Sequence, residues 1–168
     1  MDLFDLSEKV AVVTGGNGGI GLGMARGLAR AGAQLAVLGR NAEKSEQACR
    51  ELSAHGTEAF AVSVDVSRPE SVEAAIAQVV SRAGRLDILV NNAGMNIRKR
   101  PEELEPDEWK AVMDTNISSA FYCSRACYPH MKAAGGGKIL NNGSMMSLFG
   151  TPWTTAYASS KGAMVQLT

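Results

Sequence analysis

The fold is decided by residues Lys9 to Gly32, which read KVAVVTGGNGGIGLGMARGLARAG. Lys9 to Val13 form a short apolar run that favours a buried strand, and Thr14 closes it. From Gly19 to Ala31 the apolar residues recur at helical spacing, and Gly32 follows as a helix-ending glycine. The stretch therefore predicts a strand, a glycine-rich turn and a helix.

The same strand-then-helix unit recurs along the chain. Further apolar runs predict strands over residues 35–38, 59–64, 86–90 and 138–142. Helical patterns predict helices over 41–54, from a capping box at Ser67 and Glu70 to Gly84, over 107–132 with a kink at Pro129, and from 155 onward. Five strands alternating with helices predict an α/β fold, a doubly wound parallel sheet (Rossmann arrangement) in three αβα layers.

Length and strand number bear on how complete this domain is. At 168 residues a compact chain buries roughly 70% of its unfolded surface, so we expect residues 1–168 to form a single dinucleotide-binding catalytic domain. The dinucleotide-binding sheet usually has six strands, so the C-terminal strands and substrate loop are expected to be missing. We therefore expect the fifth strand to be an exposed edge, the last helix to be underpacked, and the isolated chain to be unstable and inactive.

Charge and hydropathy exclude several classes of protein. The 17 Lys and Arg balance the 17 Asp and Glu, which gives no general attraction to nucleic acid or to a membrane surface. No apolar run approaches the roughly 18 residues of a membrane span, and the start, MDLFDLSEK, is acidic where a secretory signal is basic. We expect a cytoplasmic protein.

The three cysteines, Cys49, Cys123 and Cys127, do not suggest a disulfide framework. Cys123 and Cys127 lie one helical turn apart, so a metal or redox pair is an alternative. The preferred interpretation is that both pack on the buried side of a helix. Only His55 and His130 could complete a zinc site, so no metal is expected.

The turn TGGNGGIG, Thr14 to Gly21, is suited to a pyrophosphate. Its glycines let the backbone approach closely, and the free N–H groups of the following helix stabilise negative charge. An acid that holds the ribose of NAD would stand about 20 residues further on, but Gly39 and Arg40 are found there. A guanidinium pairs well with a phosphate, so NADP is favoured over NAD. The alternative is a solvated Arg40, since the turn itself has no second basic residue.

Tyr157 and Lys161 are the most specific pair. Their spacing of four places a phenol and an ammonium on one face of the predicted helix. A neighbouring cation stabilises a phenolate, so such a pair can move a proton to or from an alcohol oxygen.

Together with NNAG (Asn91 to Gly94), Asn116 and Ser144, these motifs make the chain resemble the short-chain dehydrogenase/reductase family over nearly its whole length. The resemblance implies that Tyr157 is the general acid/base, that Lys161 holds the nicotinamide ribose, that Ser144 binds the reacting oxygen and that Asn116 holds a water. It implies an NADP or NAD site formed by Thr14, Gly15, Asn17, Gly19, Ile20, Gly21, Arg40, Asp65, Val66, Asn92, Ala93, Gly94, Tyr157 and Lys161. It also implies a homotetramer or homodimer.

The loop after NNAG suggests an anionic substrate. It contains the consecutive cations Arg98, Lys99 and Arg100, and resembles family members of the gluconate 5-dehydrogenase and 2-deoxy-gluconate 3-dehydrogenase type. We expect substrate contacts from Arg98, Ser144, Met146, Trp153 and Tyr157. The alternatives are a solvated basic loop and a core role for Met146 and Trp153.

Three other functions stay open. One is a 3-oxoacyl-type or other carbonyl reductase of the same family. The others are a non-catalytic cofactor-binding regulator, which the intact Tyr157, Lys161 and Ser144 argue against, and an inert fragment.

Overall fold

A computed structural model describes residues 3–168 of the chain. Its five strands are β1 (Val10–Thr14), β2 (Gln34–Gly39), β3 (Ala59–Ser63), β4 (Ile88–Asn91) and β5 (Lys138–Asn141). They pair in parallel in the order β3-β2-β1-β4-β5, so the predicted doubly wound sheet is confirmed. The order reverses between β1 and β4, and ligands bind at such a point in open α/β sheets.

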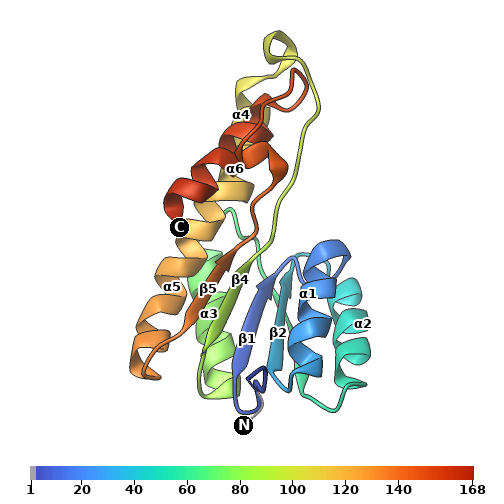
Figure 1. The fold of residues 1–168 in the computed structure, drawn as a ribbon, viewed down its shortest axis with the longest axis vertical. Coiled ribbons are helices and arrows are strands. Elements are labelled where there is room, and N and C mark those ends of the chain that lie inside the picture. Colours follow the sequence, from blue (N-terminus) through green and yellow to red (C-terminus); the bar gives the residue numbers. More distant parts are fainter. Residues whose placement is uncertain (1–2) are drawn as a thin grey trace.

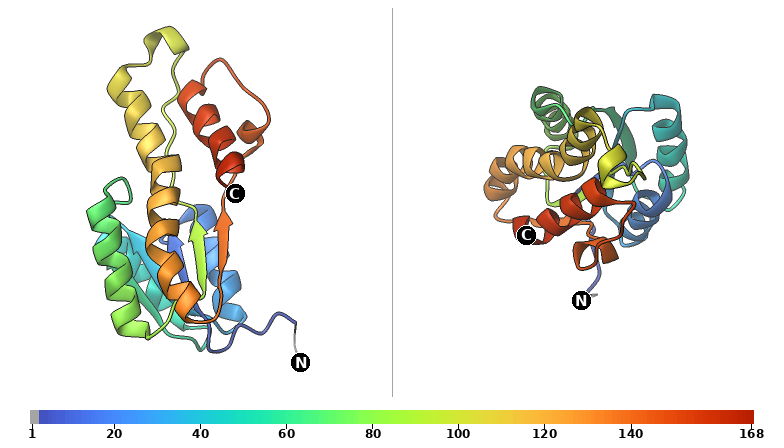
Figure 2. Two further views of the ribbon diagram at one scale, coloured as in Figure 1. Left: turned by 90° about the vertical axis from the view of Figure 1, so that its left-hand side faces the viewer. Right: turned by 90° about the horizontal axis from the view of Figure 1, so that it is seen from above.

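Helices cover both faces of this sheet (Figures 1 and 2). One face carries α1 (Gly19–Arg30) and α2 (Ala42–Ser53), and the other carries α3 (Pro69–Ala83) and α5 (Ser119–Ala133). Alternate residues of β1 explain the two layers, because Ala11 and Val13 pack toward α1 and α2 while Val10 and Val12 pack toward α3 and α5.

All three cysteines are buried and free, and the predicted burial of Cys123 and Cys127 is confirmed. Cys123 and Cys127 pack with α3 residues in the core cluster on that face, and Cys49 packs in the opposite cluster. Burial raises the pKa of the Cys123 thiol to about 12, so this thiol is protonated and unreactive at neutral pH.

The helix predicted over 107–132 contains an irregular turn. It consists of α4 (Pro106–Met113), the π-helical turn η2 (Asp114–Ser118) and α5, which includes Pro129. Its α4 end stands beside α6 (Thr155–Leu167) above the sheet, while α5 runs down along the sheet (Figure 1), and α6 packs against α4, η2 and the 3-10 turn η3 (Met145–Ser147). A further 3-10 turn, η1 (Pro101–Glu103), precedes α4.

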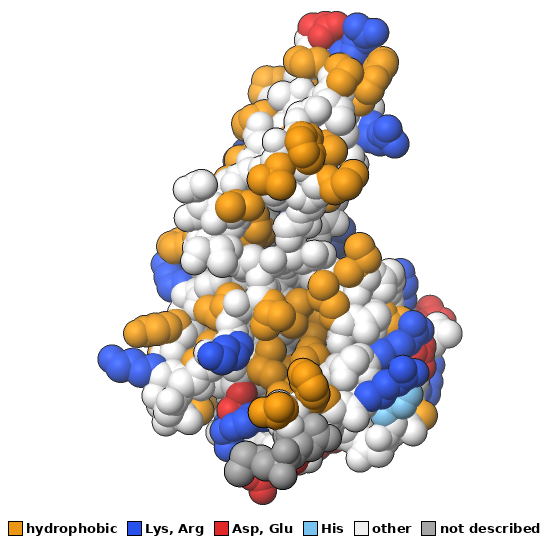
Figure 3. Space-filling model, viewed as in Figure 1, with side chains coloured by type: hydrophobic (Ala, Val, Ile, Leu, Met, Phe, Trp, Pro, Cys, Tyr) orange, Lys and Arg blue, Asp and Glu red, His pale blue; other side chains and the backbone are white. Residues whose placement is uncertain are grey.

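The strand β5 forms an exposed edge, as predicted. Among residues 3–168 it pairs only with β4, and Ile139 and Leu140 are 38% and 50% exposed. Figure 3 shows apolar side chains gathered on this face of the molecule. Within the described part of the chain, no helix combines the length and apolar composition needed to cross a bilayer.

Candidate active site

Two adjoining clefts open where the parallel strands end. The Tyr157 cleft has a volume of about 600 Å³ and is lined by Tyr157 and Lys161 of α6. The Arg40 cleft, of about 380 Å³, is lined by Arg40 after β2 and Asp65 after β3. Both are lined by Gly15, so they form one continuous groove at the carboxyl ends of the strands.

The glycine turn forms the floor of this groove. Gly15 has a φ of +63°, and a Cβ on Gly21 would lie 2.3 Å from the Gly15 carbonyl oxygen. No side chain caps the N-terminus of α1 at Gly18. The close backbone approach and the uncapped N–H groups suit a pyrophosphate, so the turn fits the predicted dinucleotide.

Most of the predicted cofactor residues meet in the groove, and two do not line it. The Tyr157 cleft is lined by Gly15, Asn17, Ile20, Gly21, Asn92, Ala93, Gly94, Tyr157 and Lys161. The Arg40 cleft is lined by Arg40, Asp65 and Val66, together with Gly15, Asn17, Ala93 and Gly94. Among the described residues, Thr14 and Gly19 line neither cleft.

Thr14 has a buried role beneath the groove. Its hydroxyl accepts hydrogen bonds from the backbone N–H groups of Asn92 (2.9 Å) and Ala93 (3.0 Å). The side-chain amide of Asn92 donates in return to the Thr14 carbonyl at 3.0 Å. These bonds hold the NNAG loop against the end of β1 and thereby shape the groove.

The end of β2 leaves no room for an acidic side chain in this conformation. A Cβ on Gly39 would lie 2.6 Å from Nδ2 of Asn17. That amide donates to the Ser45 hydroxyl at 2.9 Å, which fixes it across Gly39. The position at which an acid would hold a ribose is therefore filled by Asn17, with Arg40 following it.

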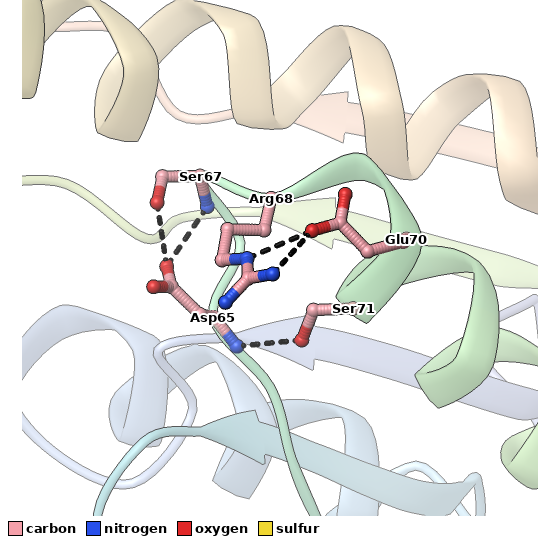
Figure 4. Close-up of polar contacts among 5 residues, drawn as sticks. All are labelled: Asp65, Ser67, Arg68, Glu70 and Ser71. Carbon is pink, nitrogen blue, oxygen red and sulfur yellow. Dashed lines mark hydrogen bonds and ion pairs between the residues drawn. The ribbon is translucent and has the colours of Figure 1, made fainter.

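Asp65 is held in place at the end of β3 (Figure 4). Its Oδ1 accepts from the backbone N–H and the hydroxyl of Ser67, at 3.1 and 2.7 Å. These bonds hold the pKa of the Asp65 carboxyl below its ordinary value. The predicted capping box at Ser67 and Glu70 is wrong, because the Ser67 hydroxyl is used by Asp65, Glu70 pairs with Arg68, and Arg68 is the N-cap of α3.

Lys44 is a cation of the groove that the sequence analysis missed. It lies in the first turn of α2, where its N–H is capped by Asn41 Oδ1 at 2.9 Å, and it lines both clefts. A Cβ on Gly18 would lie 2.9 Å from its Nζ, so the ammonium lies across the glycine turn. The N-terminus of α2 reaches the same sheet edge as that of α1, which is the signal that could have identified Lys44.

Tyr157 and Lys161 lie together at the other end of the groove. The Lys161 Nζ is 5.8 Å from the centre of the Tyr157 ring and donates to the Asn142 carbonyl at 2.6 Å. Lys161 is only 3% exposed, and burial lowers the pKa of its ammonium. Asn142, Met95 and Asn96 also line this cleft, although the sequence analysis did not place them there.

Asn116 is buried in the π-helical turn and links the groove to α6. Its Oδ1 accepts from the Met95 N–H at 2.7 Å, and its Nδ2 donates to the Met95 carbonyl and to the Ser160 hydroxyl, both at 2.9 Å. Asn116 thus fixes the loop after β4 beside the helix that carries Lys161. Its predicted role in holding a water stays a prediction.

Ser144 begins the turn η3, where its hydroxyl accepts from the Met146 N–H at 3.1 Å. Met146 in turn contacts the Thr154 hydroxyl, with its sulfur at 3.8 Å. Among the described residues, Ser144, Asn116 and the predicted substrate residues Arg98, Met146 and Trp153 do not line the two clefts. They lie in the segments that flank the Tyr157 cleft.

The three cations of the loop after β4 have different surroundings, because two of them contact other side chains and the third is exposed. The Lys99 ammonium forms a salt bridge with Glu108 at 2.6 Å, and the Lys99 backbone forms an isolated parallel β-bridge with Thr154. The Arg100 guanidinium lies 4.8 Å from the centre of the Trp153 ring. Within residues 3–168, Arg98 is exposed and has no ion-pair partner, so it is the cation of this loop that remains available.

A comparison with protein families decides the relationship. Residues 9–168 match the model of the short chain dehydrogenases. The chain belongs to this family. The family predicted from the motifs is therefore confirmed.

Individual relatives agree with this assignment. The chain is 40% identical over 167 residues to a gluconate 5-dehydrogenase of Gluconobacter oxydans (strain 621H), covering 99% of this chain and 65% of that protein. It is 37% identical to a 5-keto-D-gluconate 5-reductase of Escherichia coli (strain K12), covering 99% of this chain and 66% of that protein. The crystal structure of an NAD+-bound xylitol dehydrogenase matches with a TM-score of 0.93 at 35% sequence identity. The match covers 97% of this chain and 63% of that chain. The chain thus spans about 65% of the length of these relatives.

Proposed function

We propose that the whole protein is an NAD(P)-dependent oxidoreductase that interconverts a secondary alcohol and a ketone. The observation that carries the proposal is the Tyr157–Lys161 pair at one end of a groove whose floor is the glycine turn. Gly15 and Gly21 would hold the pyrophosphate of the cofactor, with Lys161 at the nicotinamide ribose. When bound, a nicotinamide supplies the hydride donor or acceptor.

The side chains of this chain would handle the proton and the substrate oxygen. The Tyr157 hydroxyl would exchange a proton with the substrate oxygen, as general acid in reduction and general base in oxidation. The ammonium of Lys161, 5.8 Å from the centre of the Tyr157 ring, would stabilise negative charge that develops on the Tyr157 oxygen during proton transfer. The Ser144 hydroxyl, which accepts from Met146, keeps its own hydrogen to donate to the substrate oxygen.

Replacing Tyr157 by Phe tests this assignment. The change removes one hydroxyl and keeps the ring, so we expect cofactor affinity within about threefold of wild type and a loss of turnover of at least about 10²–10⁴-fold. Cofactor affinity would be followed by fluorescence titration and turnover by absorbance of the reduced nicotinamide. Tyr122→Phe on α5, which removes the same group outside both clefts, is the control. Turnover retained in Tyr157→Phe would overturn the role.

NADP is proposed as the preferred cofactor. Arg40 and Lys44 both line the Arg40 cleft, and Asn17 fills the place beside Gly39 where an acid would repel a 2′-phosphate. Lys44 supplies the second basic residue that the glycine turn lacks. Dissociation constants for NADP and NAD, measured on the whole protein, decide the proposal, and tighter binding of NAD contradicts it.

A sugar acid is proposed as the substrate. Arg98, which has no ion-pair partner within residues 3–168, supports an anionic group, and the Asn96 amide, which lines the Tyr157 cleft, supports hydroxyl groups. Two of the relatives are named for activity on gluconate or ketogluconate. A panel of keto sugar acids, neutral ketones and 3-oxoacyl thioesters tests this, with Arg98→Gln expected to raise KM about 10–100-fold for the acids alone. Turnover of thioesters or neutral ketones in preference to the acids favours the carbonyl-reductase alternative.

Association into a homotetramer or homodimer is also proposed. Phe121 and Tyr128, seven residues apart on one face of α5, are 48% and 60% exposed, which supports a protein–protein contact there. Sedimentation of the whole protein, compared with Tyr128→Lys, tests it. A monomer at assay concentrations contradicts it.

A further inference from the structure

The Lys161 ammonium is held by the backbone rather than by an acid. It donates to the Asn142 carbonyl at 2.6 Å, directly after β5 ends. The other ionisable side chains that line this cleft within residues 3–168 are Lys44 and Tyr157. The position of the buried ammonium therefore depends on how firmly the end of β5 is fixed.

The end of β5 is fixed by Asn142 itself. Its N–H donates to the Asn91 carbonyl at 2.9 Å, which continues the pairing with β4. Its side-chain Nδ2 donates to Oδ1 of Asn92 at 3.0 Å. The side-chain bond thus joins β5 to the NNAG loop at the groove.

Asn92 carries this connection to the glycine turn. Its Nδ2 lies 3.0 Å from the Thr14 carbonyl oxygen and 3.4 Å from that of Gly15. Because carbonyls face this nitrogen, the amide orientation is determined and Oδ1 requires a donor. The Asn142 amide supplies that donor, and an unbroken path of hydrogen bonds runs from Gly15 to Lys161.

We propose that Asn142 is a positioning residue for Lys161, an inference that rests on the proposed function. Its side chain ties the end of β5 to the glycine turn through Asn92, and its carbonyl holds the ammonium at the reacting end of the groove. The two ends of the cofactor site are thereby kept at a fixed separation. Asn142 serves this role without itself exchanging a proton or binding the reacting oxygen.

Asn142→Leu and Asn142→Asp, made in the whole protein, test the proposal. Leu keeps a similar volume and removes the donor, while an ionised Asp keeps the shape and cannot donate to Asn92 Oδ1. We expect both variants to lower kcat about tenfold, the value of one lost hydrogen bond of this kind. Asn141→Leu is the matched control, because Asn141 is bonded to Asn91 and Thr168 and lines neither cleft.

A second readout follows Lys161 without turnover. The ¹³Cε resonance of Lys161, assigned by its absence in Lys161→Met, is titrated in the cofactor-free protein. A looser and more hydrated ammonium in Asn142→Leu should have a higher pKa, and the added carboxylate of Asn142→Asp should raise it further. Asn141→Leu should leave the titration of Lys161 unchanged, even if it lowers thermal stability as much as the Asn142 substitutions do.

The outcomes separate the two proposals. If both Asn142 variants fold and match Asn141→Leu in kcat and in the Lys161 titration, Asn142 has no positioning role. If an Asn142 variant fails to fold, the other variant and its titration decide. If the wild-type protein turns over no alcohol or ketone, the proposed function fails, and the titration still tests whether Asn142 positions Lys161.

Discussion

At the scale of a residue, Gly21 has the least room for a side chain. Its absent Cβ would lie 2.3 Å from the Gly15 carbonyl and 2.4 Å from the Asn92 amide nitrogen, both fixed groups. We expect Gly21→Ala to lower the free energy of unfolding by about 2–3 kcal/mol, because the glycine turn must move away from α1. Urea unfolding measures this change.

Gly27 of the same helix provides the control. It is exposed, and nothing lies within 4 Å of the position of its Cβ. Ala is the better helix former, so Gly27→Ala should raise the free energy of unfolding by up to about 1 kcal/mol. Equal effects of the two substitutions would show that helix propensity, and not contact with the turn, governs Gly21.

The groove also shows which single residues sequence reasoning can identify. Gly15, Arg40, Tyr157 and Lys161 follow strands or share a helix face, so local pattern alone places them at one sheet edge. Lys44 escaped because its ammonium reaches the glycine turn from another helix. The place of Lys44 in the first turn of α2 indicates the right sheet edge, but its contact with Gly18 depends on the separation of α1 and α2, which no local spacing encodes.

At the scale of the element, Asp87 joins the start of β4 to β1. This carboxylate is 5% exposed and accepts from the Val10 N–H at 3.0 Å and from two nitrogens of Arg85 at 2.6 and 2.8 Å. Burial raises the pKa of Asp87, but these hydrogen bonds and the positive charges of Arg85 and Lys9 together outweigh burial and leave the pKa below its ordinary value. We expect Asp87→Asn to lower the free energy of unfolding by about 2 kcal/mol at pH 7, measured by urea unfolding.

The pH dependence of that cost follows from the lowered pKa. The stabilisation by ionised Asp87 is fully present above the unfolded-state value and is lost as the pH falls through the lower folded-state value. The difference in the free energy of unfolding between wild type and Asp87→Asn should therefore become smaller below about pH 4. Glu70→Gln, which breaks an exposed pair with Arg68, should leave the free energy of unfolding unchanged within the error of the measurement. A difference for Asp87→Asn that is independent of pH would contradict the charged role.

Helix boundaries show what local pattern cannot supply. Gly32 and Gly84 both adopt positive φ after the helices that they were predicted to end. A helix irregularity at Asn116 was an alternative to its functional role, but periodicity does not encode the π-helical turn, because the buried Asn116 side chain bonds to Met95 and Ser160, 21 and 44 residues away. Helix periodicity indicates where a helix lies, and tertiary hydrogen bonds decide where it departs from regularity.

At the scale of the whole molecule, the groove connects parts that are distant in sequence. It runs from Asp65 after β3, over Gly15 at the end of β1, to Lys161 in α6. A ligand that fills it binds all of these parts in their folded arrangement only, so binding must stabilise the fold. NADP at 100 times its dissociation constant should add about 2.7 kcal/mol to the free energy of unfolding.

Thermal unfolding of the whole protein measures this effect and separates a cofactor-binding protein from an inert chain. NADP should raise Tm by several degrees and NAD at the same concentration by less, because Arg40 and Lys44 would pair only with the additional phosphate. Lys44→Met should reduce the difference between the Tm rises with NADP and with NAD. Lys132→Met, at the far end of α5, should leave this difference unchanged. If neither cofactor raises Tm, binding in the groove is refuted. If the difference between the Tm rises with NADP and with NAD is the same in wild type and in Lys44→Met, the role of Lys44 is refuted.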